Sequence, residues 1–201
     1  MKKKCFNSNG IPKEEIKRTL YKVEIDLPRE LMHHDKVISR ETFDPIIGEP
    51  IEEQAAKYSI RKRLASGVYH NKISDKYKLL SNFKLDKFNE VVKRCNDKTM
   101  VFYESKADYL LLKKYFNAND YTHQFFNQKV ELAEVNFIIG QYESMSRGID
   151  LKDLRNLIFF SPTDKFKSFK QAQFRIGRAN SYWYQVNEYR LIVKNSVQEK
   201  I

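Results

Sequence analysis

The stretch FIIGQYESMSRGIDLKDLRNLIFFSPTDKFKSFKQAQFRIGRA, residues 137–179, decides the fold of this chain. Two short apolar runs, residues 135–140 and 154–160, are rich in β-branched and aromatic side chains and predict buried parallel strands. After Pro162, residues 165–179 predict a helix. The order strand, loop, strand, helix indicates an α/β domain.

The loop between the two predicted strands carries several groups that could bind a ligand. It reads SMSRGIDL and holds two hydroxyls, a guanidinium, a glycine and a carboxylate: Ser144, Ser146, Arg147, Gly148 and Asp150. Open α/β sheets bind ligands in loops at the carboxyl ends of their strands. The alternative for Gly148 and Asp150 is a tight turn closed by an Asx-type hydrogen bond.

Three polar side chains of the predicted helix 165–179 fall on one face. Gln171, Arg175 and Arg178 stand at positions i, i+4 and i+7, which share a helical stripe. The sequence therefore predicts a polar, basic stripe on this helix. The alternative is a solvated basic face with ordinary carboxylate partners.

Together these segments resemble the second RecA-like domain of superfamily 2 helicases and translocases. SRGIDL resembles motif V and QAQFRIGRA resembles motif VI, and both possible registers of motif VI select Arg175 and Arg178. The resemblance implies that these two arginines act on ATP as the catalytic residues. It also implies nucleotide-site roles for Gly148, Asp150 and Gln171, and nucleic-acid backbone contacts from Ser144, Ser146 and Arg147.

A second strand–loop–helix unit precedes this stretch. TMVFY, residues 99–103, predicts a buried strand, and residues 104–116 predict an amphipathic helix with Leu110, Leu111 and Phe116 facing inward. In the resembled family this position is motif IV, which implies nucleic-acid contacts from Ser105 and Lys106. The alternative, equally open, is that Ser105 only caps the helix.

The N-terminal part predicts a smaller segment. Residues 1–18 predict a polar arm, LYKVEIDL at 20–27 alternates as a half-buried strand does, and residues 29–50 predict either a short helix or irregular structure. Residues 51–68 predict a helix that Gly67 ends, with a stripe of Ala55, Tyr58 or Ser59, and Ala65. LASGVY within it resembles a phrase of phage-type Swi/Snf-like helicases.

The remaining segments complete the predicted domain. Residues 84–95 predict a helix, no element is predicted in residues 117–134, and residues 186–193 predict a strand. A capped turn is expected to follow at Asn195 or Ser196, with Glu199 beyond; YRLIVKNSVQEKI resembles a Swi/Snf phrase. We therefore predict a RecA-like three-layer α/β domain with a mostly parallel sheet at 76–201, preceded by the arm and a smaller strand-plus-helix segment at 1–75.

The charge balance favours an anionic partner. With 37 Lys+Arg against 26 Asp+Glu, the net charge of +11 suits nucleic acid, and DNA is the expected polymer. The alternative is an ordinary solvated basic surface. No apolar run approaches the ~20 residues of a membrane span, so a cytoplasmic protein is expected, in the host cytoplasm if a phage encodes it. Cys5 and Cys95 have no metal-ligand spacing, and no metal site of the chain itself is expected.

The missing motifs limit the predicted activity. None of the six glycines is followed by Lys, and no Asp-Glu dipeptide occurs, so a P-loop and its acidic partner pair are absent. The chain is therefore interpreted as the C-terminal half of a Swi/Snf-like ATP-dependent helicase or translocase, encoded separately or cut from a longer protein. ATP and Mg²⁺ are expected only at an interface with a P-loop half. The alternative is a non-enzymatic module that binds nucleic acid or a helicase partner; an unrelated enzyme has no nucleophile–base pair in its favour.

Overall fold

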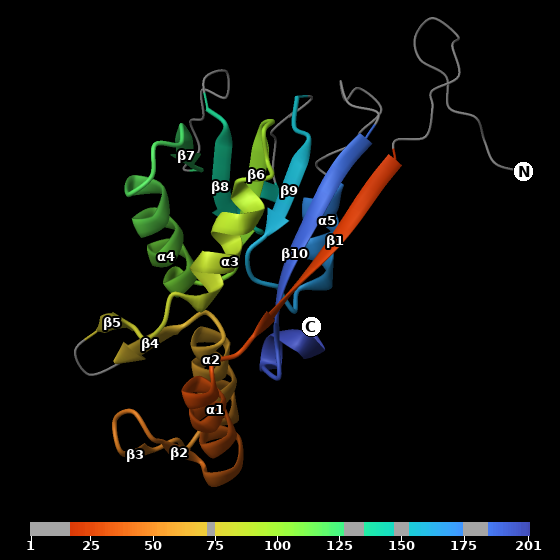
Figure 1. Cartoon of the computed structure of the whole chain (residues 1–201). Helices are drawn as coiled ribbons and strands as arrows, with labels where there is room; N and C mark the ends of the chain where they lie inside the picture. The colour runs from red at the N-terminus through yellow and green to blue at the C-terminus, as the bar shows by residue number, and fades with distance from the viewer. Residues whose placement is uncertain (1–16, 72–74, 127–134, 147–152, 175–184) are drawn as a thin grey trace, which may run out of the picture.

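The computed structural model describes residues 17–71, 75–126, 135–146, 153–174 and 185–201 (Figure 1). Their centre is a six-stranded sheet in the order β1-β10-β9-β6-β8-β7, in which every neighbouring pair is parallel. The strands are β1 (Lys17–Asp26), β6 (Thr99–Tyr103), β7 (His123–Phe125), β8 (Phe137–Gln141), β9 (Asn156–Phe159) and β10 (Gln185–Lys194). The predicted α/β class is confirmed.

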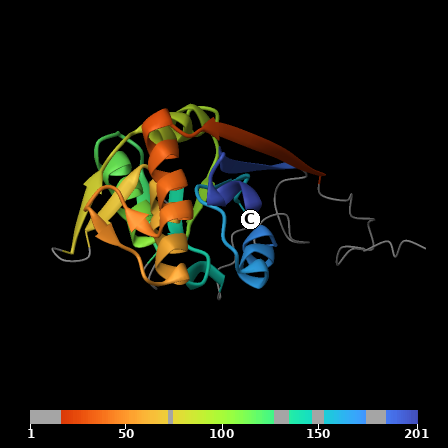
Figure 2. The same cartoon turned by 90° about the horizontal axis from the view of Figure 1, so that it is seen from below.

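Helices cover both faces of the sheet. The helices α3 (Phe83–Val92) and α4 (Lys106–Asn117) lie on one face, and α5 (Phe166–Gln173) lies on the other (Figures 1 and 2). A hydrophobic core lies on each face of the sheet. Alternate residues of β6 contribute to the two cores, because successive strand side chains point to opposite faces. Val101 packs in the larger core with Phe88 of α3, whereas Phe102 packs in the smaller core with Ala172 of α5. The predicted three-layer architecture is confirmed.

A small helical layer lies beyond the carboxyl ends of the strands (Figure 1). It contains α1 (Arg29–Glu41), α2 (Gln54–Leu64) and two hairpins, β2 (Phe43–Asp44) with β3 (Glu49–Pro50) and β4 (Val68–Asn71) with β5 (Lys76–Leu79). Residues 29–50 are thus a helix followed by a hairpin. The strand of this N-terminal segment, β1, is paired along all of its residues with β10 and so belongs to the main sheet.

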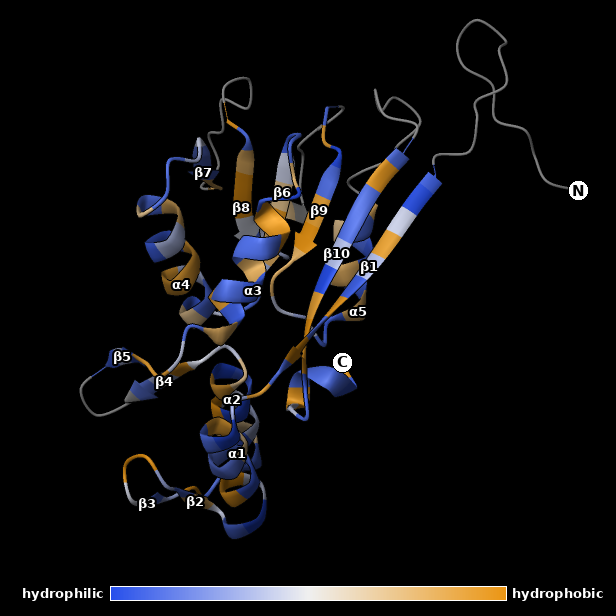
Figure 3. Cartoon of the chain, in the orientation of Figure 1, coloured by the Kyte–Doolittle hydropathy of each residue, from blue (hydrophilic) through white to orange (hydrophobic). Residues whose placement is uncertain are grey.

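Hydrophobic residues mark where the sheet is covered. They are concentrated in β8, β9 and the ends of β1 and β10 nearest α1 and α2 (Figure 3). Ile25 and Val193 are buried at those ends, while Leu20 near the start of β1 is 54% exposed. No helix in the described ranges combines the length and the apolarity that crossing a bilayer needs.

The helix predicted at 51–68 is shorter in the structure, and its buried face differs from the predicted stripe, of which Ala65 is buried. The helix begins at Gln54, because Glu53 before it is extended and the Ile51 N–H is hydrogen-bonded to the Thr42 carbonyl. The buried stripe is Lys57, Ile60 and Leu64, and Ala55 is exposed. Ile60 and Leu64 each remove more apolar surface from water than Ala55 would.

Gly67 ends the turn after α2, as predicted. It has a φ of +76°, and its N–H donates to the Leu64 carbonyl at 2.8 Å. A Cβ at this position would lie 2.3 Å from the Ser81 carbonyl oxygen. A larger residue therefore meets both backbone strain and a collision with the backbone after β5.

Two further predictions needed correction. In α4, Leu111 and Phe116 are buried as expected, but Leu110 is 37% exposed and Leu112 takes its place inside. The edge strand β7 occupies part of residues 117–134, where no element was predicted. The helix predicted at 165–179 forms as α5 but ends at Gln173, and residues 175–179 lie outside the described residues. The predictions of α3, β10 and the capped turn η2 (Val197–Lys200) were confirmed, and in that turn Ser196 Oγ accepts from the Gln198 N–H at 3.1 Å.

Candidate functional site at the strand ends

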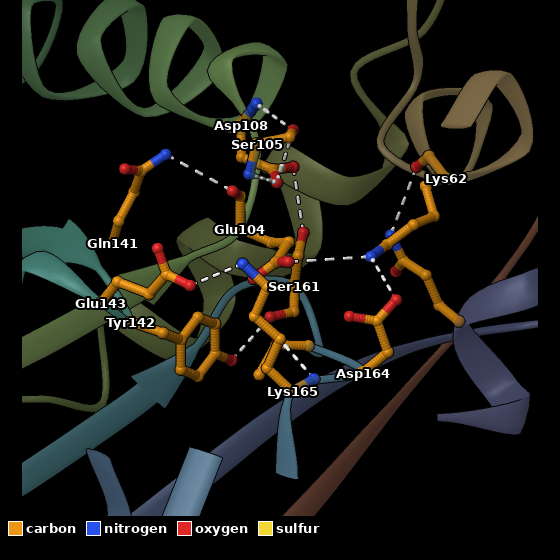
Figure 4. Close-up of polar contacts among 12 residues, drawn as sticks. Lys62, Glu104, Ser105, Asp108, Gln141, Tyr142, Glu143, Ser161, Asp164 and Lys165 are labelled. Carbon is orange, nitrogen blue, oxygen red and sulfur yellow. Dashed lines mark hydrogen bonds and ion pairs between the residues drawn. The ribbon is translucent and has the colours of Figure 1, made fainter. Parts of the chain in front are cut away.

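Three central strands end side by side and point polar residues at the same edge of the sheet. β6 lies between β8 and β9, and its register pairs Tyr103 with Gln141 and Phe102 with Phe159. The chain passes from β8 to β9 across β6, so the strand order changes direction here. Such a switch point is where open α/β sheets bind ligands. Figure 4 shows the polar side chains that gather there.

Ser105 begins α4 with a complete capping box. Its Oγ accepts from the Asp108 N–H at 3.1 Å, and Asp108 Oδ2 accepts from the Ser105 N–H at 3.0 Å (Figure 4). The Ser105 hydroxyl also donates to Asp108 Oδ2 at 2.8 Å. The interpretation of Ser105 as a helix cap is therefore confirmed. Its contact with nucleic acid stays a prediction.

Lys106 and Ser144 lie at this same edge with exposed side chains. The Lys106 ammonium lies 5.5 Å from the centre of the Tyr77 ring of β5. Ser144 begins the short 3-10 helix Ser144–Ser146 after β8, and its Oγ donates to the Gln141 carbonyl at 3.1 Å. Gln171 is exposed on α5, on the other face of the sheet. The structure thus groups Ser105, Lys106 and Ser144.

Lysine–carboxylate pairs line the outer part of this edge. Lys62 of α2 reaches across, with its Nζ 3.8 Å from Glu104 and 3.5 Å from Asp164. Lys165 Nζ lies 2.5 Å from Glu143. Burial raises the pKa of Glu104, against the opposing effects of a hydrogen bond with Thr163 and the charge of Lys62. Any phosphate that binds these lysines must compete with the carboxylates they already contact.

Beneath these pairs lies a lysine without solvent exposure. Lys84 of α3 is 0% exposed, and its Nζ donates to Ser66 Oγ at 3.3 Å, Ser161 Oγ at 2.6 Å and Gln198 Oε1 at 3.2 Å. The ammonium also lies 4.6 Å from the centre of the Phe160 ring. Burial lowers the pKa of Lys84 to about 8, and the nearby negative charge of Asp108 opposes that shift.

A pocket of about 580 Å³ lies beside this edge, between α5 and η2. Its walls carry both signs of charge, with Asp164 and Glu199 set against Lys170 and Arg190. Arg190 is itself held by Glu188 at 2.6 Å. The pocket therefore favours no single charge class of ligand.

The other predicted site residues lie outside the described residues. These are Arg147, Gly148 and Asp150 of the motif V segment and both motif VI arginines, Arg175 and Arg178. For Ser146 only the backbone is described. Their roles at the nucleotide and the nucleic acid stay predictions.

Sequence reasoning missed the buried residues of this site. Ser105 and Asp108 show the S-x-x-D spacing of a capping box, which could have identified Asp108. Lys84 gave no such signal, because a lysine in an amphipathic helix is expected on the solvent side. Ser66, Ser161 and Gln198 come from three separate segments and have no pattern in common.

Comparison with known proteins supports the fold. No family model matches the chain, and no curated protein matches it. Among solved structures, the C-terminal part of the Fun30 ATPase domain is similar, with a TM-score of 0.70 and 12% identity over 93% of this chain and 88% of that one. The Pyrococcus furiosus Hef helicase domain gives a TM-score of 0.48 and 18% identity over 60% of this chain and 27% of that one.

These findings define the class of domain. The parallel six-stranded sheet with helices on both faces is a RecA-like α/β fold, and the C-terminal part of the Fun30 ATPase domain has a similar fold. At 12% identity this likeness concerns the fold, and activity does not follow from fold alone.

Proposed function

We propose that this chain is the C-terminal half of a Swi/Snf-like superfamily 2 ATP-dependent helicase or DNA translocase, of phage type, which works with a P-loop half. The observation that carries the proposal is the likeness to the C-terminal part of an ATPase domain across 93% of the chain. The motif-like segments support it, because residues 144–150 connect β8 to β9 and the motif VI segment begins in α5.

ATP and Mg²⁺ would be held mainly by the P-loop half. Bound there, ATP supplies the phosphoanhydride bond whose hydrolysis drives movement on nucleic acid. This chain contributes positive charge: Arg175 and Arg178 stabilise negative charge on the phosphates when the two halves close. Gln171, exposed on α5 four residues before Arg175 in the sequence, assists at the same nucleotide. Gly148 and Asp150 connect the nucleic-acid loop to the nucleotide.

Nucleic acid would cross the strand ends where β6 and β8 stop. Lys106 offers an exposed ammonium, and Ser144 an exposed hydroxyl. Ser105 uses its hydroxyl in the capping box, so its contribution is to fix the first turn of α4 and thereby the position of Lys106. Ser146 and Arg147 extend the contact from the motif V side. With a net charge of +11, this binding is sequence-tolerant and weakens as salt rises.

The proposal is tested by measuring ATP hydrolysis with the chain alone, a candidate P-loop half alone, and both together. Each mixture is assayed with and without a DNA duplex and with a single-stranded RNA. We expect hydrolysis that needs both proteins and rises with DNA. Magnesium-dependent turnover by the purified chain alone would contradict the division of labour.

A nucleic-acid-binding RecA-like module without an ATP cycle is the second candidate. The exposed Lys106 and the absence of a P-loop from this sequence favour it. DNA binding by the chain, together with no effect on any P-loop partner, would support this alternative over the split ATPase.

A further inference from the structure

The buried Lys84 and Asp108 are joined by two parallel hydroxyl bridges. Ser66 Oγ accepts from Lys84 Nζ and donates to Asp108 Oδ1 at 2.7 Å. Ser161 Oγ also accepts from Lys84 Nζ and donates to Asp108 Oδ1 at 2.9 Å. With Gln198 as its third acceptor, Lys84 uses all three of its N–H donors.

The two bridges connect different parts of the molecule. Ser66 belongs to the turn that follows α2, whereas Ser161 follows β9 and begins the loop that leads into α5. Asp108 meets both, and it also fixes the first turn of α4 through its capping box with Ser105. The Ser161 carbonyl also accepts from the Tyr142 hydroxyl at 2.7 Å, and this bond connects the residue after β8 to the same loop.

Burial makes this network stiff. Ser66, Lys84, Asp108 and Ser161 are each at most 2% exposed, so water cannot replace a broken bond in place. A buried charge that loses its partner carries a large desolvation cost. A displacement of the first turn of α4 must therefore either move Ser161 with it or leave a charge unpaired.

We infer that Lys84 is a positioning residue that couples the nucleic-acid edge at the start of α4 to the loop that leads into α5. The path runs from Ser105 through Asp108 and Ser161, and Lys84 holds Ser161 and Asp108 in register. Contact of a phosphate backbone with Lys106 then changes the loop 161–165 and the start of α5, in which the motif VI segment begins. This inference rests on the proposed function.

The two serines provide a matched pair of variants. Ser161→Ala and Ser66→Ala each remove one hydroxyl that accepts from Lys84 and donates to Asp108. Only Ser161→Ala interrupts the path to α5. The measurement is the change in amide chemical shifts of the ¹⁵N-labelled chain when a short DNA duplex is added, followed at residues 105–107 and at residues 163–168.

In the wild-type chain and in Ser66→Ala, we expect DNA to shift the amides of both groups. In Ser161→Ala, the shifts at 105–107 should remain and those at 163–168 should be lost. Lys84→Met, whose fold is checked by thermal melting, should behave as Ser161→Ala does. If Lys84→Met does not fold, the two serine variants decide the question alone.

Three results would count against the inference, and they separate it from the proposed function. DNA that shifts neither group of amides overturns both the inference and the nucleic-acid part of the proposed function. Wild-type shifts at 105–107 without any at 163–168 overturn the inference alone. Equal loss at 163–168 in both serine variants shows a general structural role for the network, which also overturns the coupling.

Discussion

Two sets of lysine–carboxylate contacts lie within one edge of the sheet and differ in burial. Lys84 and Asp108 are 0% and 2% exposed and are joined through two serine hydroxyls. In the second set, the Lys165 and Glu143 side chains are 55% and 66% exposed and form a direct ion pair. The residue types and charges are alike, so burial is the main difference between the two sets.

This difference decides what each set contributes. Exposed ion pairs are worth little, because water and salt screen them and two long side chains lose entropy on pairing. A buried pair has a large desolvation cost, and removing one partner leaves an uncompensated charge. We therefore assign structural positioning to Lys84 and Asp108, whereas the exposed Lys165 can exchange its carboxylate partner for another anion.

The largest expected effect on stability is that of Asp108→Ala. The substitution removes the acceptor of the Ser66 and Ser161 hydroxyls and leaves the Lys84 ammonium buried without its counter-ion. We expect the free energy of unfolding to fall by about 3–5 kcal/mol, measured by chemical denaturation at pH 7. A matched double variant, Lys84→Met with Asp108→Leu, should recover part of that loss. If Asp108→Ala lowers the free energy of unfolding by less than about 0.5 kcal/mol, Lys84 and Asp108 contribute no more to stability than a surface ion pair does.

The pH dependence of stability should reveal Lys84. Its folded-state pKa is about 8, below the ordinary lysine value of 10.5. Between these values the unfolded chain binds more protons than the folded chain, so the Lys84 contribution to stability rises with pH from about 8 to about 10.5. Between pH 7 and 9.5 we expect wild type to gain about 1–2 kcal/mol relative to Lys84→Met.

This comparison controls for groups that change in the opposite direction. Burial raises the pKa of Cys95 to about 11, which lowers stability as pH rises above its ordinary value of 9.0. Wild type and Lys84→Met both contain Cys95, so its effect cancels in the stability difference between them. Both proteins also keep Asp108 opposite position 84. A difference that does not change with pH would mean that Lys84 titrates as an exposed lysine.

The smallest effect belongs to the exposed pair. Lys165→Gln should leave the melting temperature unchanged, because both side chains are mainly in water. Ser161→Ala, in the same loop but 2% exposed, should lower stability by about 1–3 kcal/mol by leaving Lys84 and Asp108 each one partner short. Thermal melts of the two variants side by side check the contrast. Similar losses for both would remove the distinction between the two sets of contacts.

The predictable part of the fold is the part with dense local patterns. Residues 99–103 were predicted as a strand and form β6 at those bounds, because Met100, Val101 and Phe102 are a short buried apolar run of the kind that parallel strands contain. Gly67 was predicted to end its helix, since a positive φ at this point suits glycine. Such signals are short in range and can be read from neighbouring residues.

The unpredicted part depends on contacts between distant segments. β1 pairs with β10 in a register that joins Lys17 to Gln185, which no local pattern indicates. The buried face of α2 contains Lys57 and Leu64, because tertiary packing decides which side of the helix is covered. Lys84 is buried by Ser66, Ser161 and Gln198 from three segments, so its role became visible only in three dimensions.

The central claim is that this chain completes an ATP site held by a P-loop half, and Arg178 tests it most directly. The measurement is the steady-state, DNA-stimulated ATPase rate of the reconstituted pair for wild type, Arg178→Ala, Arg178→Lys and the control Lys167→Ala, an exposed lysine of α5. Arg178→Ala should lower the rate by about 10³–10⁵ with DNA binding and melting temperature nearly unchanged. Arg178→Lys should rescue little, because an ammonium lacks the planar fork of a guanidinium, and Lys167→Ala should match wild type. Equal turnover for wild type and Arg178→Ala would contradict the account.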